Sequence, residues 1–96
     1  MDIITVSIEE IANLVSYRFY LSIHHDGRKK NDALARMITE IKQQESALLR
    51  ENEEALRIEL ADEIIRVRRL RPPERVALYS EGSRWLVAML VADLAQ

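Results

Sequence analysis

Residues 53–71, EEALRIELADEIIRVRRLR, carry the pattern from which we predict the fold. At 100° per residue, one side of a helix through this stretch is a first apolar stripe of Leu56, Leu60, Ile64, Val67 and Leu70. Nearly opposite lies a second apolar stripe of Ile58, Ala61 and Ile65. A helix at the edge of a globule buries only one stripe. Two opposed stripes therefore predict a helix that is covered on both sides, by its own chain or by a second copy.

This helix is predicted to be long. No glycine or proline occurs over residues 31–71, so we expect one helix of about 60 Å at 1.5 Å per residue. The apolar pattern thins over residues 42–54, and a hairpin at residues 50–53 is the alternative. Pro72 and Pro73 end the helix, because proline lacks the amide donor and restricts the residue before it.

A first helix precedes the long one. Ser7 as N-cap and Glu10 three residues later form a capping-box pattern, which predicts the start of this helix. The pair at 26–27, Asp-Gly, ends it, and a basic loop at 28–30 follows before residue 31 or 32 caps the long helix. Three aromatic residues on the first helix form a cluster typical of a core or an interface: Tyr17, Phe19 and Tyr20.

The last helix begins at Pro73, because proline suits the first helical positions. Gly82 and Ser83 mark a kink or a break, and Ser83 is able to cap the segment after it. Residues 85–92 are apolar all round. Such a helix is typical of the centre of a bundle or of a subunit interface.

Composition limits the class of protein. The chain has 96 residues, which is enough for one small domain, and we expect a single all-helical domain over residues 1–96. It has no cysteine, which excludes disulfides and thiolate metal sites. No signal-peptide pattern is present, and the longest apolar run of eight residues is short of the roughly 20 that span a bilayer. We therefore expect a soluble, cytoplasmic protein.

The charges are unevenly distributed, although the net charge is only −2. Residues 40–63 hold eight acids, and residues 64–75 hold five arginines, so two antiparallel copies would attract each other. The two flanking helices are too short to wrap the long one. We therefore predict a homodimer, and a protein-binding surface formed by Leu56, Ile58, Leu60, Ile64, Ile65, Val67, Trp85 and Met89.

An acidic pair in this stretch suggests different chemistry. Glu59 and Asp62 stand at i and i+3 of one helical face, where two carboxylates can hold Mg²⁺. The segment ELADEIIRV resembles the second acidic motif of MazG-like all-α nucleotide pyrophosphohydrolases. The resemblance implies Mg²⁺ bound by Glu40, Glu59 and Asp62, but residues 39–45, TEIKQQE, depart from that family's Glu-Glu-x-x-Glu spacing. Alternatively, the pair belongs to a solvated strip in which Asp62 pairs with Arg66.

Five arginines follow the acidic region and suggest a surface for phosphate groups: Arg66, Arg68, Arg69, Arg71 and Arg75. The simpler interpretation is that arginine is favoured near the carbonyl end of a helix.

Taken together, the sequence predicts an all-α protein of three main helices with a long central one, completed by homodimerisation. We expect a small non-catalytic binding or regulatory protein that docks on another protein, without a cofactor or metal. The alternatives are a degenerate MazG-like enzyme that uses Mg²⁺ and a nucleic-acid-binding regulator.

Overall fold

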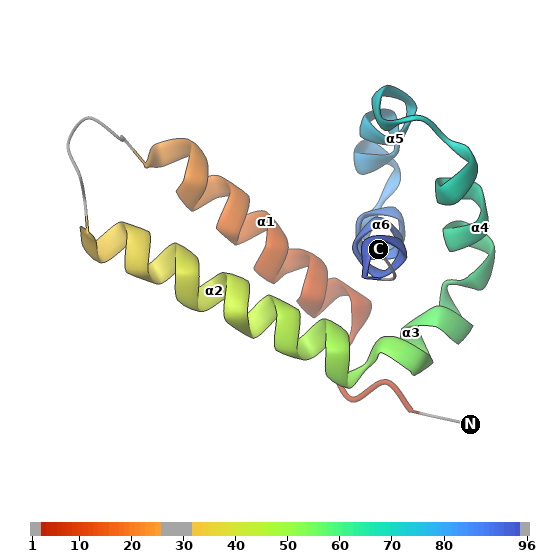
Figure 1. Cartoon of the computed structure of the whole chain (residues 1–96), viewed down its shortest axis with the longest axis horizontal. Coiled ribbons are helices and arrows are strands. Elements are labelled where there is room, and N and C mark those ends of the chain that lie inside the picture. Colours follow the sequence, from red (N-terminus) through yellow and green to blue (C-terminus); the bar gives the residue numbers. More distant parts are fainter. Residues whose placement is uncertain (1–2, 26–31, 95–96) are drawn as a thin grey trace.

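The structure, a computed structural model, describes residues 3–25 and 32–94. All of the regular structure in these residues is helical, as predicted: α1 (Ile8–His24), α2 (Asp32–Glu51), α3 (Glu53–Glu59), α4 (Ala61–Arg69), α5 (Pro72–Leu78), the 3₁₀ turn η1 (Tyr79–Glu81) and α6 (Ser83–Asp93). Helices α1 and α2 form an antiparallel pair, and α3, α4 and α5 curve around α6, which is seen end-on in Figure 1.

The start of α1 is confirmed. The Ser7 backbone is extended, with φ −72° and ψ 154°, and its Oγ accepts a hydrogen bond from Glu10 N at 3.1 Å. This bond satisfies one of the amides that the first helical turn leaves without an intrahelical partner. The helix ends at His24, and the expected Asp-Gly end signal, the basic loop and the Asn31 cap lie outside the described residues.

The prediction of one long continuous central helix is not confirmed, because two bends divide the stretch into α2, α3 and α4. Asn52 (φ −111°, ψ 8°) separates α2 from α3, and Leu60 (φ −107°, ψ 21°) separates α3 from α4. Helical hydrogen bonds continue through both, from Leu56 N to Asn52 O and from Ile64 N to Leu60 O, each at 2.8 Å. The chain therefore bends without reversing, and the hairpin alternative does not hold either. The curvature keeps the first apolar stripe against α6 (Figure 1).

Asn52 also ties this bend to the N-terminal segment. Its Oδ1 accepts hydrogen bonds from Thr5 N at 2.9 Å and from Thr5 Oγ1 at 3.0 Å. Its Nδ2 donates to Leu48 O at 2.8 Å. The side chain is buried, and these three bonds satisfy both of its polar atoms.

The later breaks lie where proline and glycine predict them, within one residue. Helix α4 ends before Leu70, whose ψ is 144°, and α5 begins at Pro72 rather than at Pro73. Gly82 has φ 133° and separates η1 from α6, so Ser83 is the first residue of α6 rather than its cap. Nothing lies within 4 Å of a Cβ built at Gly82. Glycine is therefore favoured here by the backbone conformation and not by crowding.

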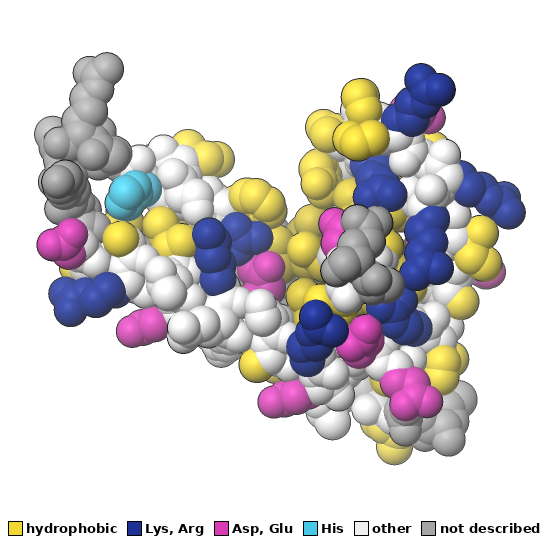
Figure 2. Space-filling view, in the orientation of Figure 1, with side chains coloured by type: hydrophobic (Ala, Val, Ile, Leu, Met, Phe, Trp, Pro, Cys, Tyr) yellow, Lys and Arg dark blue, Asp and Glu magenta, His cyan; other side chains and the backbone are white. Residues whose placement is uncertain are grey.

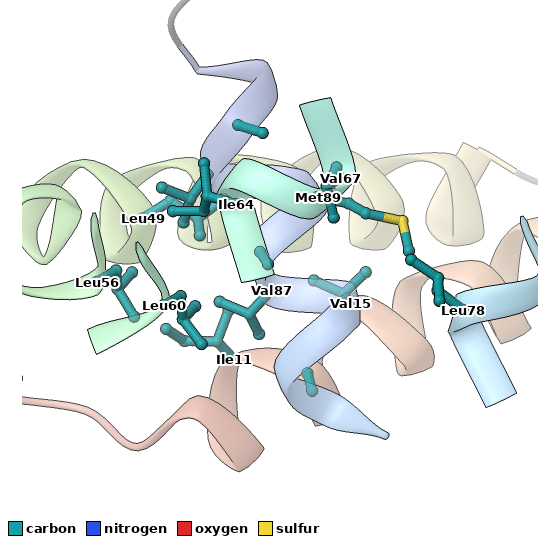
Figure 3. Close-up of a cluster of buried hydrophobic side chains, with 14 residues drawn as sticks. Ile11, Val15, Leu49, Leu56, Leu60, Ile64, Val67, Leu78, Val87 and Met89 are labelled. Atoms are coloured by element: carbon teal, nitrogen blue, oxygen red, sulfur yellow. The ribbon is translucent and has the colours of Figure 1, made fainter. Parts of the chain in front are cut away.

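The core is built around α6, as its apolar sequence predicts. Side chains from α1, α3 and α4 converge on it, as Figure 3 shows for Ile11, Leu60 and Val87. The first apolar stripe is buried in this core at Leu56, Leu60, Ile64 and Val67, and Leu70 packs against its edge. Figure 2 shows a notch between the α1–α2 pair and the part of the molecule that contains α4, α5 and α6, with hydrophobic side chains on its walls. No helix among the described residues is long and apolar enough to cross a membrane.

Candidate functional site

The second apolar stripe lies on the outer side of α3 and α4, and the chain does not cover it. Ile58 is 54 % exposed and Ile65 is 50 % exposed, and Ala61 between them is also exposed. Ile58 and Ile65 are seven residues apart, which corresponds to two helical turns, so they lie on the same side of the bent helix. The prediction that both stripes are covered is therefore confirmed by the single chain for the first stripe only, and the second stripe is exposed.

The eight residues of the predicted partner-binding set differ in their exposure. Five of its members are buried in the core of the single chain and cannot contact a partner in this conformation: Leu56, Leu60, Ile64, Val67 and Met89. Ile58 and Ile65 remain exposed. Trp85 is half-buried, and the guanidinium Cζ of Arg66 lies 5.0 Å from the centroid of its ring. The available apolar surface on α3 and α4 is thus narrower than the sequence indicated.

Arg84 forms an ion pair with Glu59, one of the two carboxylates of the predicted acidic pair. Its Nη1 contacts Glu59 Oε1 at 3.0 Å, its Nε contacts Glu63 Oε1 at 2.9 Å, and its Nη2 donates to Glu59 O at 2.9 Å. Burial raises the pKa of Glu63, but the hydrogen bond from Arg84 and other favourable contacts outweigh it and leave the pKa below 4.5. Glu63, followed by Glu59, raises the pKa of Arg84.

This arrangement does not assemble the magnesium site of the alternative interpretation. Glu40 lies on α2, Glu59 ends α3 and is paired with Arg84, and Asp62 lies on α4. Within residues 3–25 and 32–94, no three His, Asp or Glu side chains are grouped to hold a metal ion. Arg84 was missed from the sequence because it follows Glu59 by 25 residues and joins it only through the packing of α6 on α4.

One arginine of the predicted phosphate-binding cluster, Arg75, bonds to other residues of the chain, and the others are exposed to solvent. Arg75 Nε donates to Val67 O at 3.0 Å and to Leu70 O at 3.3 Å, so this side chain completes the C-terminal end of α4. Its Nη1 also contacts Asp93 Oδ1 at 3.5 Å. Four arginines of the cluster remain exposed: Arg66, Arg68 and Arg69 on α4, and Arg71 after it. Figure 2 shows basic side chains over this part of the surface.

A second apolar surface is a groove of about 490 Å³ in the notch between α1 and the η1–α6 segment. We define the apolar groove by its lining residues: Ser16, Phe19, Tyr20, Ile23, Tyr79 and Leu86. Phe19 is 47 % exposed, Tyr20 58 %, Tyr79 51 % and Ile23 80 %. Phe19 and Tyr20 were expected at a core or an interface. Tyr79 and Leu86 were missed, because nothing local in the sequence shows that they face α1.

An ion pair joins α1, which forms one wall of the apolar groove, to α2. Arg18 Nε and Nη2 contact Glu45 Oε2 and Oε1 at 2.8 and 3.3 Å, which joins α1 to α2. The Arg18 and Glu45 side chains are only 15 % and 10 % exposed. The Cζ of Arg18 also lies 4.6 Å from the centroid of the Phe19 ring, which steadies that ring at the groove.

Comparison of the chain with protein-family models, with curated proteins and with solved structures gives no significant match.

Proposed function

We propose that this chain is a small non-catalytic protein-binding or regulatory protein, and that it acts as a homodimer joined through the second apolar stripe. The observation that carries the proposal is the exposure of Ile58 and Ile65 on a bent helix whose opposite side is buried at Leu56, Leu60, Ile64 and Val67. The expected occupant of this surface is a second copy of the same chain.

Charges beside the stripe support a second copy over an unrelated partner. Asp62 and Arg69 are both exposed, and they are seven residues apart on the side of α4 that carries Ile65. Ile65 lies near the midpoint between them. A two-fold axis close to Ile65 would set Asp62 of each copy opposite Arg69 of the other, because in a two-fold interface each contact occurs twice. The two Ile65 side chains would meet at the axis, and the small Ala61 would allow close approach.

The size of the second apolar stripe determines how tightly two copies are expected to bind. Its apolar part consists of two half-exposed isoleucines and one alanine. The surface area that these side chains can bury is less than the roughly 800 Å² that each partner contributes to a standard interface. Exposed ion pairs contribute about 0–1 kcal/mol each and are weakened by salt. We therefore expect weak association that weakens further as the salt concentration rises.

Light scattering and sedimentation over protein concentrations from about 1 µM to about 1 mM would test the dimer. Asp62→Arg places like charges opposite each other and should weaken the dimer, and so should Arg69→Asp. The double variant Asp62→Arg/Arg69→Asp exchanges the two charges and should restore it. Glu40→Arg is the matched control, since it makes the same charge change at an exposed position of α2.

A protein that stays monomeric at the highest concentration and low salt would rule out the dimer. The proposed pairing of Asp62 in each copy with Arg69 in the other would be wrong if the two single variants weakened the dimer and the double variant did not restore it.

A further inference from the structure

We infer that the exposed arginines at the end of α4 bind the phosphate backbone of double-stranded nucleic acid, without regard to its sequence. We define the basic patch by these four residues: Arg66, Arg68, Arg69 and Arg71. Figure 2 shows basic side chains over the part of the surface that contains α4. This role goes beyond the proposed protein-binding function, and it does not depend on the dimer.

The arginines of the basic patch have no carboxylate partner in the described part of the chain. Within residues 3–25 and 32–94, none of the four forms an ion pair, whereas five other arginines do: Arg18, Arg50, Arg57, Arg75 and Arg84. The two acids of α4 leave these charges unmatched. Glu63 is paired with Arg84, and Asp62, one turn before Arg66, forms no ion pair with it. Four positive charges within six residues are therefore available to an anionic partner.

The carbonyl end of α4 does not account for the basic patch. Arginine is favoured near a helix end because it can bond the last carbonyls. In α4 this role belongs to Arg75, whose Nε donates to Val67 O at 3.0 Å and to Leu70 O at 3.3 Å. The other arginine side chains that bond a backbone carbonyl within the described ranges are Arg57 and Arg84. The patch is therefore not needed to complete the helix.

A nucleic-acid backbone matches the charge density of the basic patch. Arg66 and Arg69 are three residues apart, about 4.5 Å along the helix axis and about 60° around it. A DNA duplex carries one negative charge per about 1.7 Å of its axis, so it offers several phosphates over such a length. Each guanidinium group can bind phosphate oxygens through two parallel hydrogen bonds. A single carboxylate would leave most of the patch unmatched.

The basic patch offers contacts to phosphates rather than to bases. Trp85 is the aromatic residue that contacts it, but Trp85 is half-buried, and the Cζ of Arg66 lies over its ring at 5.0 Å from the centroid. This ring is therefore not free to stack on an unpaired base, which is how proteins commonly hold single strands. Contacts to phosphates position a protein on a duplex and carry no sequence information. We therefore expect sequence-independent binding to double-stranded nucleic acid.

An anionic membrane fits this surface less well than a duplex does. A flat membrane that reached the basic patch would also approach exposed carboxylates on the outer side of α3 and α4, Glu54 and Asp62. Like charges would then oppose the attraction. A duplex is a rod and can contact the end of α4 alone.

Fluorescence anisotropy of a labelled DNA duplex of about 20 base pairs, titrated with the whole chain at several salt concentrations, tests the inference. The logarithm of the binding constant should fall linearly with the logarithm of the salt concentration. The expected slope is about −3 to −4, because each neutralised phosphate contributes about −0.9. Arg68→Gln and Arg71→Gln should each reduce the slope by about 1 and weaken binding roughly tenfold at about 50 mM salt. Both residues lie outside the proposed pairing of Asp62 with Arg69.

Arg36→Gln is the matched control. Arg36 is exposed on α2 and forms no ion pair within residues 3–25 and 32–94, so the variant makes the same change of charge outside the basic patch. It should leave the slope unchanged. Duplexes of different sequence should bind equally well, and a single strand with the same number of phosphates should bind more weakly than the duplex.

Absence of binding at about 20 mM salt, where phosphate contacts are strongest, would overturn the inference. A slope that Arg36→Gln reduces as much as Arg68→Gln would also overturn it, and so would tighter binding to the single strand. Binding to vesicles of phosphatidylserine and phosphatidylcholine without binding to the duplex would assign the patch to a membrane instead. A protein that binds the duplex but stays monomeric would contradict the proposed dimer alone, and a dimer that does not bind the duplex would contradict this inference alone.

Discussion

Asn52 and Thr5 are joined by two hydrogen bonds across 47 residues of sequence, from Thr5 N at 2.9 Å and from Thr5 Oγ1 at 3.0 Å to Asn52 Oδ1. The same side chain bonds Leu48 O, one turn earlier in α2. A single buried amide therefore holds both the bend of the central helix and the segment that leads into α1.

Replacing Asn52 by leucine should lower the free energy of unfolding by about 2–3 kcal/mol, because it removes three hydrogen bonds and leaves the Thr5 amide without its partner. Urea denaturation followed by circular dichroism would measure the change. Asn13→Leu, at an exposed position of α1, is the control and should stay within about 0.5 kcal/mol of the parent. Equal effects of the two substitutions would contradict the role given to Asn52.

Replacing Arg18 by methionine should destabilise the protein by about 2–4 kcal/mol, since it leaves the Glu45 carboxylate nearly buried and without its bidentate partner. The double variant Arg18→Met/Glu45→Met should recover most of the loss, because two apolar side chains replace two charges. A double-mutant cycle measured by urea denaturation would show this coupling. Additive losses at the two positions would mean that the pair does not act as a unit.

Lowering the pH should destabilise the fold through two glutamates. The hydrogen bond from Arg57 lowers the pKa of Glu53 below 4.5, more than its burial raises it, and the pKa of Glu63 is also lowered, as described above. A carboxyl with a lower pKa in the folded state adds stability above its unfolded pKa. That stability is lost as the pH falls through the folded pKa.

Melting temperatures between neutral pH and about pH 3 should therefore fall less steeply for Glu63→Gln than for the parent protein. Glu40→Gln, at an exposed position of α2, is the control and should follow the parent curve. A parent curve that is flat on the acidic side would disprove this linkage.

Magnesium should not stabilise the protein. Glu59 is paired with Arg84, and Glu40 and Asp62 lie on other helices, so residues 3–25 and 32–94 offer Mg²⁺ no group of three carboxylate ligands. The melting temperature should stay unchanged with about 10 mM Mg²⁺, because only a ligand that binds the folded state raises it. A rise that Asp62→Asn abolishes would revive the nucleotide-hydrolase alternative, and a magnesium-dependent pyrophosphatase assay would then be decisive.

The sequence predicts those parts of the fold that have local causes. Three residues constrain the backbone next to them: Ser7, Pro72 and Gly82. Each lies within one residue of a helix boundary in the structure. The bends at Asn52 and Leu60 have no such signal. Asn52 is fixed by contacts with Thr5, and Leu60 is completely buried in the core, so both bends depend on residues far away in sequence.

The candidate surfaces were predictable to different degrees. The period of the second apolar stripe placed Ile58 and Ile65 together, and the structure leaves both exposed. The apolar groove could not be predicted, because Phe19 meets Tyr79 and Leu86 only after α6 has packed between α1 and α4. Periodicity shows which side chains share a face, and it does not show which faces meet.

The position of α6 has a consequence for biosynthesis. This helix supplies the centre of the core, yet the ribosome makes residues 83–93 after every helix that packs on them. Until those residues leave the exit tunnel, Leu56, Leu60 and Val67 lack the contacts that α6 provides, and the nascent chain exposes part of this apolar stripe. A ribosome stalled just before this helix would therefore hold a chain with exposed apolar surface, of the kind that chaperones bind, and synthesis of α6 would complete the core.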